Sequence, residues 1–505
     1  MSGTLMLSVS GCRGVLGETL TPETAARFAG AFGSVLRERA GGRRVTVILG
    51  RDGRKGSEIV EFAALSALMA SGCCVVDLGV AMTPTVAVMT DSVWRRVQAS
   101  GGYSAGMVIT ASHNPQQWIG LKCLLADTAA RGEADFGSAA CAPPASVADE
   151  IIARFKSGRV GLCDWKSAGE VASDHESIAE HVDRVLDAIE QCGLCADPST
   201  IGAGLSVAVD SVNASGVAGA REMMEALGVE ELLHLGMEDS GLFPHPPEPT
   251  AENLDLPGGL CDAVRESESD VGFAQDPDAD RLAIVDERGV YIGEEYTLAL
   301  SAMALLEAER NRGTNTQGRT LVTNLSTSRM LEDVAARYGA QVLRTAVGEA
   351  NVVEAMKREA SLLGGEGNGG TIWPRVAFVR DSLSAMALTL WLISPGGGGK
   401  GRKRKLSEIV AGMPAYAIEK RKVELARRED ADPAVAAIRK HFAGERIDLQ
   451  DGVRVDFTTG ALAGKAWLHV RASNTEPIMR LIAEAPTKTD ANAILDLAGR
   501  VISGS

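Results

Sequence analysis

The sequence predicts an α/β protein of three mixed α/β domains with a similar plan, followed by a C-terminal α+β domain, and three observations support this. The chain has 505 residues, which is too many for one hydrophobic core. Short β-branched runs alternate with stretches of helical period as far as about residue 412, a pattern typical of mostly parallel sheets. Beyond that residue, strands follow one another through short turns, which indicates an antiparallel sheet with helices.

The first domain is expected over residues 1–198. Thr21, Pro22 and Glu23 indicate a helix start, because a capping hydroxyl precedes a proline at the first helical position and then an acid. Residues 126–175 are rich in Ala, Gly and Ser and predict a loose excursion. The other expected elements are strands over 45–49, 73–80 and 107–110 and helices over 57–71 and 178–189.

The remaining domains are expected over 199–292, 293–412 and 413–505. Their expected strands lie at 205–209, 320–324, 341–344, 361–363, 453–457, 466–470 and 478–483, and their expected helices at 296–310 and 490–502. The glycine-rich segment 395–405 predicts a flexible loop. Its five basic residues are interpreted as a solvated loop rather than a nucleic-acid patch.

Composition and charge exclude several classes of partner. Hydrophobic content of 45% and charged content of 23% are those of a soluble globular protein. The formal net charge of -15 repels nucleic acid and anionic membranes. The uncharged run 382–394 is too short to span a bilayer, and the N-terminus lacks the features of a signal peptide. We therefore expect a cytoplasmic protein with reduced cysteines and a small-molecule partner, with no nucleic acid and no membrane.

The stretch 106–123 carries the first candidate site. Its apolar run ends in a turn of small and polar residues. Open α/β sheets bind ligands at the carboxyl ends of buried strands, so Ser112 is a candidate nucleophile; the alternative is a loop serine that bonds its own backbone. His113 should point away from Ser112 in an extended chain and is expected to fix the loop. Lys122 could reach back over the site or lie on the surface.

Asp276, Asp278 and Asp280 alternate along a second stretch. Three carboxylates this close repel one another unless a cation neutralises them, and oxygen ligands suit Mg²⁺ or Ca²⁺. We reject an EF-hand, because Arg281 stands where that loop needs glycine and strand-like runs flank the motif. The sequence therefore predicts a Mg²⁺ site on a loop between strands, and the alternative is a solvated acidic turn.

Two further stretches carry polar groups in turns. Residues 364–370 form a glycine-rich loop after an apolar strand, in which Glu366 and Asn368 could bond sugar hydroxyls; a flexible turn explains the pattern equally well. Residues 471–477 combine an arginine, two hydroxyls and an amide around a turn, which suits a phosphate, and Arg480 follows. A capped turn without a ligand is the alternative there.

Taken together, these motifs resemble the α-D-phosphohexomutase superfamily over essentially the whole chain. Four segments occur in the family's order: 10–14 (SGCRG) with 110–115 (TASHNP), 276–281 (DPDADR), 365–370 (GEGNGG) and 471–477 (RASNTEP). The resemblance implies a Mg²⁺-dependent isomerase with four domains around a central cleft. The WIGLK and GEGNGG segments are most similar to the phosphoglucosamine mutase branch, and phosphoglucomutases and phosphomannomutases are similar too.

The resemblance also implies a role for each matching residue. Ser112 matches the serine that carries the transferable phosphoryl group. The metal ligands are then a Ser112 oxygen with Asp276, Asp278 and Asp280, and the catalytic set is Ser112, Lys122, Arg13 and His113. The residues implied for substrate binding are Arg281, Glu366, Gly367 and Asn368. Those implied for gripping the non-reacting phosphate are Arg471, Ser473, Asn474, Thr475 and Arg480.

The implied reaction passes a phosphoryl group from phosphoserine to a hexose phosphate, giving hexose 1,6-bisphosphate as intermediate and activator. Its other phosphate then returns to the serine. Glucosamine phosphate is the first-choice substrate; the alternatives are glucose or mannose phosphate and, from another class, a non-catalytic sugar-phosphate-binding protein. Two departures concern Ile119, where many members have Asn, and Gly370, where some have an acid–base His. We expect a monomer or a homodimer.

Overall fold

The computed structural model describes residues 5–97, 101–126, 140–425, 427–472 and 478–503, and its strands form four sheets. The first sheet has the order β1-β2-β6-β5-β3-β4-β8, with β7 paired to β6. Its strands are β1 (Met6–Ser8), β2 (Gly11–Val15), β3 (Val45–Arg51), β4 (Cys74–Val80), β5 (Tyr103–Ile109), β6 (Trp118–Ala126), β7 (Ala140–Cys141) and β8 (Val171–Ser173). The helices of this first unit are α1 (Pro22–Ala40), α2 (Ser57–Ala70), α3 (Thr83–Val97), α4 (Ala145–Ser157) and α5 (Ser177–Gln191). Thr21 caps α1 at the predicted start.

The segment 126–175, predicted as a loose excursion, contains the ordered helix α4. This helix packs on α1 through buried apolar residues four positions apart: Val147, Ile151 and Phe155. The prediction was wrong here because the apolar period of so short a helix is hidden among Ala and Ser. Residues 127–139 of the segment lie outside the described residues.

The second and third units have the sheet orders β10-β9-β11-β12 and β14-β13-β15-β16. The second comprises η3 (Pro198–Thr200), β9 (Ser206–Asp210), α6 (Gly216–Ala226), β10 (Glu231–Leu235), α7 (Ala251–Leu254), α8 (Leu260–Ser267), β11 (Val271–Gln275) and β12 (Leu282–Asp286). The third comprises α9 (Tyr296–Asn311), β13 (Thr320–Asn324), α10 (Met330–Tyr338), β14 (Gln341–Thr345), α11 (Glu349–Glu359), β15 (Leu363–Glu366), β16 (Gly370–Ile372), α12 (Ser382–Ile393) and α13 (Leu406–Ala411). The first glycines of the predicted glycine-rich loop therefore belong to β15.

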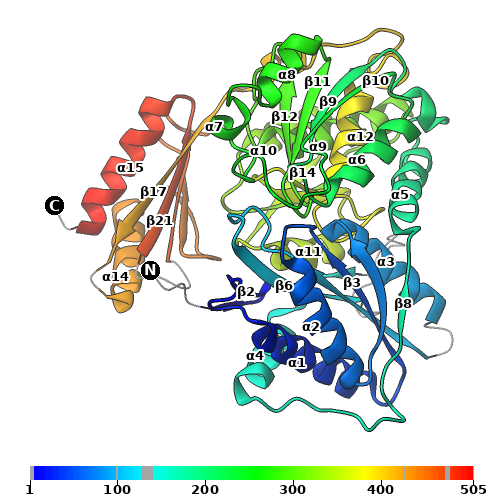
Figure 1. The fold of residues 1–505 in the computed structure, drawn as a ribbon. Coiled ribbons are helices and arrows are strands. Elements are labelled where there is room, and N and C mark those ends of the chain that lie inside the picture. The colour runs from blue at the N-terminus through cyan, green and yellow to red at the C-terminus, as the bar shows by residue number, and fades with distance from the viewer. Residues whose placement is uncertain (1–4, 98–100, 127–139, 426, 473–477, 504–505) are drawn as a thin grey trace.

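The first three sheets share one four-strand plan, which confirms the prediction of similar α/β units. The sets β4-β3-β5-β6, β10-β9-β11-β12 and β14-β13-β15-β16 are arranged alike. Counted in sequence order, the first strand of each set (β3, β9 or β13) lies between two parallel neighbours, and the fourth is antiparallel to the third. The turn between the third and fourth strands is therefore equivalent in each unit. We call these turns the serine turn (110–117), the aspartate turn (276–281) and the glycine turn (366–370, which includes the last residue of β15 and the first of β16). In Figure 1 the first unit is blue to cyan, and the second and third are green to yellow.

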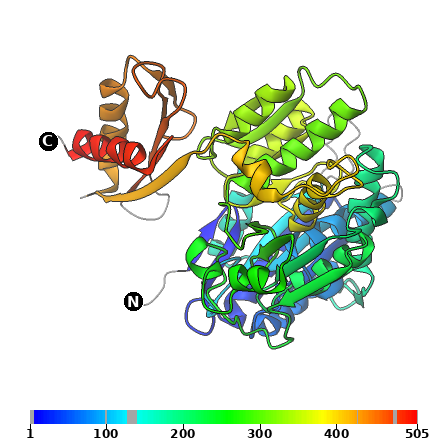
Figure 2. The same cartoon turned by 90° about the horizontal axis from the view of Figure 1, so that it is seen from above.

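The C-terminal unit is an antiparallel sheet with helices, as predicted. Its order is β17-β21-β20-β19-β18. Its elements are β17 (Ala417–Glu424), η4 (Arg428–Asp430), α14 (Ala431–His441), β18 (Arg446–Asp448), β19 (Val453–Asp456), β20 (Trp467–Ala472), β21 (Ile478–Ala485) and α15 (Lys488–Ser503). Figures 1 and 2 both show this unit set to one side of the other three.

The uncharged run 382–394 is a buried core element. Every residue of α12 is buried, and the helix packs on α9 in a core that also receives residues of the first and second units. A helix that is apolar all round can be stable in water only when neighbours cover it on every side. In the part of the chain that the structure describes, we find no helix long and apolar enough to cross a membrane.

Candidate functional site

Ser112 lies at the apex of the serine turn, with its side chain directed at the aspartate turn. The residue is 2% exposed, and its hydroxyl donates to Asp276 Oδ2 at 2.7 Å. Its backbone adopts φ of 50°, a left-handed conformation that is uncommon for a serine. The Thr110 hydroxyl accepts the Ser112 backbone N–H at 2.8 Å and so closes the turn locally. Among the described residues, the serine hydroxyl contacts side chains and has no hydrogen bond to the backbone of its own turn, unlike an ordinary loop serine.

The left-handed backbone at Ser112 also brings the next side chain to the hydroxyl. Ser112 Oγ and His113 Nδ1 are 3.3 Å apart, so the prediction that these side chains point apart was wrong. It assumed extended backbone, which positive φ excludes. Burial, together with the charges of Arg281 and Arg13, lowers the pKa of His113 to about 3. The imidazole is therefore neutral at physiological pH, and its Nδ1–H can donate to the serine oxygen while the serine hydroxyl donates to Asp276.

Arg54, a buried arginine without a predicted role, supports the serine turn through hydrogen bonds to backbone carbonyls. Arg54 is 1% exposed and donates to the carbonyls of Ser112 at 2.5 Å and Trp118 at 2.6 Å. It also forms an ion pair with Asp52 at 2.8 Å. The available signal was the Arg-Asp-Gly-Arg segment that begins at the end of β3, because β3 and β5 are parallel neighbours whose carboxyl ends meet at one sheet edge.

The aspartate turn gathers three buried carboxylates. Oxygens of Asp276, Asp278 and Asp280 lie within 4.8 Å of one another. Lys122 Nζ reaches back to them, at 2.5 Å from Asp278 Oδ2 and 3.1 Å from Asp280 Oδ2. Of the two locations considered for this lysine, the structure therefore shows the one over the site. The motif lies between β11 and β12, so the rejection of an EF-hand is confirmed.

The electrostatics of the aspartate turn suit a hard cation. Burial alone would raise the pKa of Asp278, but the Lys122 ammonium and the Thr83 hydroxyl hold it well below its ordinary value. Burial, followed by the charges of its two neighbours, raises the pKa of Asp276 well above its ordinary value. Oδ1 of Asp278 and Oδ1 of Asp280 are buried without a hydrogen-bond partner. Buried carboxylate oxygens without donors fit a divalent cation that takes oxygen ligands.

Three arginines surround the carboxylates. Arg13 donates to Asn114 Oδ1 at 3.3 Å, next to the serine turn. The Arg281 backbone N–H donates to Asp276 Oδ1 at 3.2 Å, and Arg281 Nε lies 3.9 Å from Asp280 Oδ1. The structure adds Arg380, which had no predicted role. This set of cations is suited to an anionic ligand next to Ser112.

Arg380 joins the aspartate turn to the glycine turn. Its guanidinium contacts Asp280 at 2.6 Å, Glu349 at 2.8 Å and Glu366 at 3.2 Å. A Cβ at Gly370 would lie 2.1 Å from Arg380 Cδ, so the arginine stem fills the space that a side chain at this position would need. The glycine at position 370, where some members of the family have His, therefore makes room for the Arg380 side chain. No local sequence pattern indicates the role of Arg380, since its partners come from three separate segments.

The glycine turn is held by buried hydrogen bonds and places Asn368 on the wall of a cavity. Glu366 is buried and accepts from Asn324 Nδ2 at 2.9 Å, and the Gly367 N–H donates to Thr327 Oγ1 at 3.0 Å. Asn368 Oδ1 is buried without a partner. A cavity of about 390 Å³ is lined by residues of the second, third and C-terminal units, among them Glu248, Thr250, Arg281, Asn368, Tyr416 and Lys420. This volume lies within the range of small-molecule sites.

The last predicted motif is described only in part. Arg471 and Arg480 face each other across β20 and β21 as directly opposite partners, and Arg471 Nε lies 3.1 Å from Asp451 Oδ2. Ser473, Asn474 and Thr475, which were predicted to bind phosphate, lie outside the described residues. The two arginines therefore flank a segment whose ligand-binding role stays a prediction.

Comparisons with known proteins give the family context of this geometry. Family models of phosphoglucomutase/phosphomannomutase match over 5–135 (α/β/α domain I), 181–289 (domain II), 294–416 (domain III) and 422–498 (C-terminal domain). A probable phosphoglucosamine mutase of Methanopyrus kandleri is 34% identical over 96% of this chain and 95% of the relative. A phosphoglucomutase/phosphomannomutase of Thermococcus kodakarensis is 32% identical over 97% of each. A solved phosphoglucomutase/phosphomannomutase family protein of Burkholderia thailandensis superposes with a TM-score of 0.77 at 24% identity, covering 99% of this chain and 98% of the other.

Proposed function

We propose, from the premise that this chain belongs to the phosphoglucomutase/phosphomannomutase family of α-D-phosphohexomutases, that it interconverts hexose 6-phosphate and hexose 1-phosphate through a phosphoserine at Ser112. Members of this family are mutases. The observation that carries the proposal is the Ser112 hydroxyl, buried and 2.7 Å from a cluster of three carboxylates and a lysine. The serine hydroxyl can accept a phosphoryl group, and the lysine and a cation held by the carboxylates can balance the charge of that group.

The residues that would hold a Mg²⁺ ion are Asp276, Asp278 and Asp280 with an oxygen of Ser112 or its phosphate. The two unpartnered carboxylate oxygens support this assignment. When bound, the ion would neutralise charge on the transferring phosphoryl group. Lys122 also lies against these carboxylates and is therefore a cation of the chain itself at the transfer site.

The transfer itself needs one net proton movement. The bond between Ser112 Oγ and phosphorus breaks and the bond between phosphorus and a hexose hydroxyl oxygen forms. The Lys122 ammonium would give a proton to the departing serine oxygen and take one back from the hexose hydroxyl. Arg13 and Arg281 would stabilise the phosphoryl group as it moves. His113, neutral and 3.3 Å from Ser112 Oγ, would orient the serine hydroxyl before it accepts a phosphate. The bisphosphate then turns over and returns its other phosphate to Ser112.

Recognition of the sugar would fall to the third unit, and recognition of its second phosphate to the C-terminal unit. Glu366, Gly367 and Asn368 would bind sugar hydroxyls from the glycine turn. Arg471 and Arg480, with Ser473, Asn474 and Thr475, would hold the phosphate that is not reacting. A remote phosphate clamp is useful because either end of the bisphosphate must be held while the other end reacts.

Glucosamine phosphate is the substrate we propose first. The support is a relative named probable phosphoglucosamine mutase at 34% identity over nearly the whole chain. The second candidate is glucose or mannose phosphate, which a relative named phosphoglucomutase/phosphomannomutase at 32% identity supports. A cytoplasmic location, a monomer or homodimer, and domain boundaries near 198, 292 and 412 stay predictions.

A side-by-side mutase assay tests the proposal. Purified protein with Mg²⁺ and a trace of hexose 1,6-bisphosphate is given glucosamine 6-phosphate, glucose 1-phosphate or mannose 1-phosphate, with Ser112→Ala as control. We expect isomerisation without release of free phosphate, a phosphate on Ser112 by mass spectrometry, and no turnover in Ser112→Ala. Wild-type rates in that variant would refute the phosphoserine route. Release of free phosphate would indicate a phosphatase, because a mutase must exclude water from the intermediate.

A further inference from the structure

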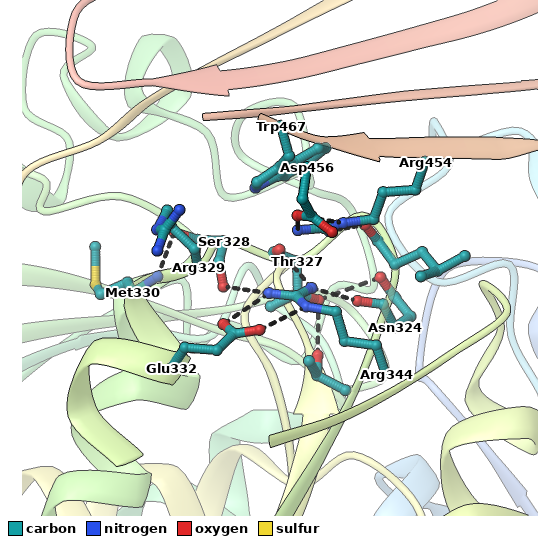
Figure 3. A network of polar contacts seen from close by, with 12 residues as sticks. Asn324, Thr327, Ser328, Arg329, Met330, Glu332, Arg344, Arg454, Asp456 and Trp467 are labelled. Carbon is teal, nitrogen blue, oxygen red and sulfur yellow. Dashed lines mark hydrogen bonds and ion pairs between the residues drawn. The ribbon is translucent and has the colours of Figure 1, made fainter. Parts of the chain in front are cut away.

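The turn between β13 and α10, residues 324–329, touches the glycine turn directly. We call it the interface turn, and Figure 3 shows its network. Thr327 Oγ1 accepts the Gly367 N–H at 3.0 Å, and Asn324 Nδ2 donates to Glu366 Oε1 at 2.9 Å. The backbone and the acid of the glycine turn are therefore both hydrogen-bonded to the interface turn. A displacement of one turn must move the other or break two buried hydrogen bonds.

Three strands of the C-terminal unit bind the same interface turn. Arg454 of β19 donates to the Leu325 carbonyl, and His469 of β20 contacts Ser326 Oγ through Nδ1 at 2.8 Å. Glu484 of β21 accepts the Arg329 N–H at 3.0 Å. These C-terminal side chains, Arg454, His469 and Glu484, are 2%, 0% and 0% exposed. Buried polar groups of this kind are costly to leave unpaired, so the contacts hold the C-terminal unit to the turn.

The C-terminal groups are themselves held in place. Arg454 forms an ion pair with Asp456 at 2.8 Å and lies over the Trp467 ring, with 4.3 Å from its guanidinium carbon to the ring centre. The Trp467 indole N–H donates to Glu484 Oε1 at 2.8 Å, and His469 Nε2 contacts the Asp451 carbonyl at 2.7 Å. The surface that meets the interface turn is therefore rigid, and it moves with its sheet as one body.

The third unit grips the interface turn from the other side. Arg344 donates to the carbonyls of Asn324 and Thr327, each at 2.8 Å, and pairs with both carboxylate oxygens of Glu332. The Ser328 N–H donates to Glu295 Oε2 at 2.8 Å. That same carboxylate lies against the glycine turn, where a Cβ at Gly367 would be 2.0 Å from Oε2. The glycine turn and the interface turn therefore both contact the half-buried carboxylate of Glu295.

We propose that the interface turn is a positioning element that couples the placement of the C-terminal unit to sugar recognition by the glycine turn. The proposal deepens the proposed function and rests on it for the identity of the ligand. β20 carries His469 and then Arg471, so the strand that holds the turn leads directly into the segment expected to grip the remote phosphate. A phosphate bound by the C-terminal unit would thereby set the position of the groups that contact the sugar.

Ser326→Ala is the least disruptive test variant, because it removes one hydroxyl contact to His469 and touches none of the proposed binding groups. Thr327→Val removes the acceptor of the Gly367 N–H on the other side of the turn. Ser66→Ala is the matched control, since Ser66 is an exposed serine on α2 that bonds only its own helix. Arg454→Lys provides a second and stronger perturbation. Its control is Arg421→Lys, which alters the exposed ion pair between Arg421 and Asp496.

Hydrogen–deuterium exchange of the full-length protein without ligand measures the coupling between the interface turn and the glycine turn independently of activity. We expect Ser326→Ala and Arg454→Lys to raise exchange over 363–372 by about fivefold or more, the effect of losing one buried hydrogen bond. Exchange over 271–286 should not change, and neither control should affect either segment. Unchanged exchange over 363–372 in both variants would overturn the proposal, provided that thermal melting shows Ser326→Ala to be folded.

Kinetics then test the link to the substrate. Ser326→Ala should raise KM for the hexose phosphate about fivefold with kcat within twofold of wild type, and Ser326→Ala/Thr327→Val should show less than the product of the single effects. A fall in kcat with unchanged KM, or strictly multiplicative effects, would overturn the positioning role. If the wild-type protein isomerises no hexose phosphate, the proposed function fails, while the exchange experiment still decides whether the two turns are coupled.

Discussion

At Ser112 the backbone is held in a conformation that an isolated serine would rarely adopt. A left-handed φ at a residue other than glycine costs about 1 kcal/mol or more, so surrounding contacts must stabilise it. Arg54 supplies those contacts, because it binds the Ser112 and Trp118 carbonyls and is anchored by Asp52. The benefit is that the serine oxygen points at Asp276 instead of back along its own turn.

Arg54→Lys should therefore slow the loading of Ser112. A lysine ammonium cannot reach the Ser112 and Trp118 carbonyls and Asp52 at once, and loss of positioning commonly lowers rates by about 10- to 100-fold. The measurement is the initial rate of Ser112 phosphorylation by hexose 1,6-bisphosphate, followed by intact mass. Arg39→Lys, which alters an exposed pair with Glu150, should retain the wild-type rate. Equal rates for both variants would contradict this prediction.

Removal of divalent cations should abolish turnover. The aspartate turn has buried oxygens without donors, and a bound ion commonly contributes several kcal/mol to such transfers, or about a thousandfold in rate. The experiment is chelation followed by titration with Mg²⁺. Asp280→Asn should raise the Mg²⁺ concentration needed for half-maximal activity, whereas Asp270→Asn, a partner of Lys403 outside the site, should not. Full activity after chelation would contradict the prediction.

The sequence indicated the residues whose chemistry lies in a local motif. Ser112 and the Asp triplet stand in short polar turns after buried strands, and the structure brings them together with Lys122. Arg54 and Arg380 were missed because a buried arginine has no periodic signature, and each has partners in segments distant in sequence. The contact between Ser112 and His113 depends on one positive φ, which residue spacing does not reveal.

At the scale of elements, β20 joins the third unit to the C-terminal unit through a buried histidine. His469 contacts Ser326 Oγ with Nδ1 and the Asp451 carbonyl with Nε2, so the neutral ring satisfies both partners when Nε2 carries the hydrogen. Burial, aided by the charges of Arg454 and Arg471, lowers the pKa of His469 to about 4, although Asp451 acts in the opposite direction. Protonation of the ring would add a second cation beside Arg454.

The attachment of the C-terminal unit should therefore weaken in acid. In the unfolded chain the histidine has a pKa near 6.5, so the unfolded state binds the proton first as pH falls. The contribution of His469 is complete above pH 6.5 and is lost progressively down to pH 4, by up to about 3 kcal/mol. Thermal melting at pH 7.5, 6.0 and 4.5 checks this. His469→Gln should lose less stability than wild type over that interval, and a larger loss would contradict the assignment.

The element pattern was predictable where strands and helices are long or strongly apolar, and less so elsewhere. The strand 320–324 coincides with β13, and the expected helix start at Pro22 is the observed one. α4 and the short strand β18 were missed because their apolar residues are few and scattered. The glycine-rich loop was predicted too long, since 364–366 belong to β15, Gly370 belongs to β16, and only 367–369 lie between the two strands.

At the scale of the whole molecule, the chain contains separate hydrophobic cores. One continuous core draws residues from the first three units, from Ile48 to Met413. The core of the C-terminal unit consists only of residues between Ala431 and Ala498. The predicted boundary near 412 lies close to Met413, the last buried residue of the first of these cores. Polar contacts join the two clusters, among them those of the interface turn and the pairs Lys420–Glu294 and Tyr416–Asp333. Independent cores joined by polar contacts are expected to unfold separately.

We therefore predict two thermal transitions by calorimetry, each sensitive to a different buried leucine. Leu481→Ala, in the C-terminal core, and Leu388→Ala, in α12, both remove a fully buried side chain, which costs about 2–5 kcal/mol. Because a unit of this size shifts by about 4–8 °C per kcal/mol, Leu481→Ala should lower only the C-terminal transition, by roughly 10 °C or more. Leu388→Ala should lower only the other. A single transition that both substitutions lower would show that the interface turn joins the cores into one cooperative unit.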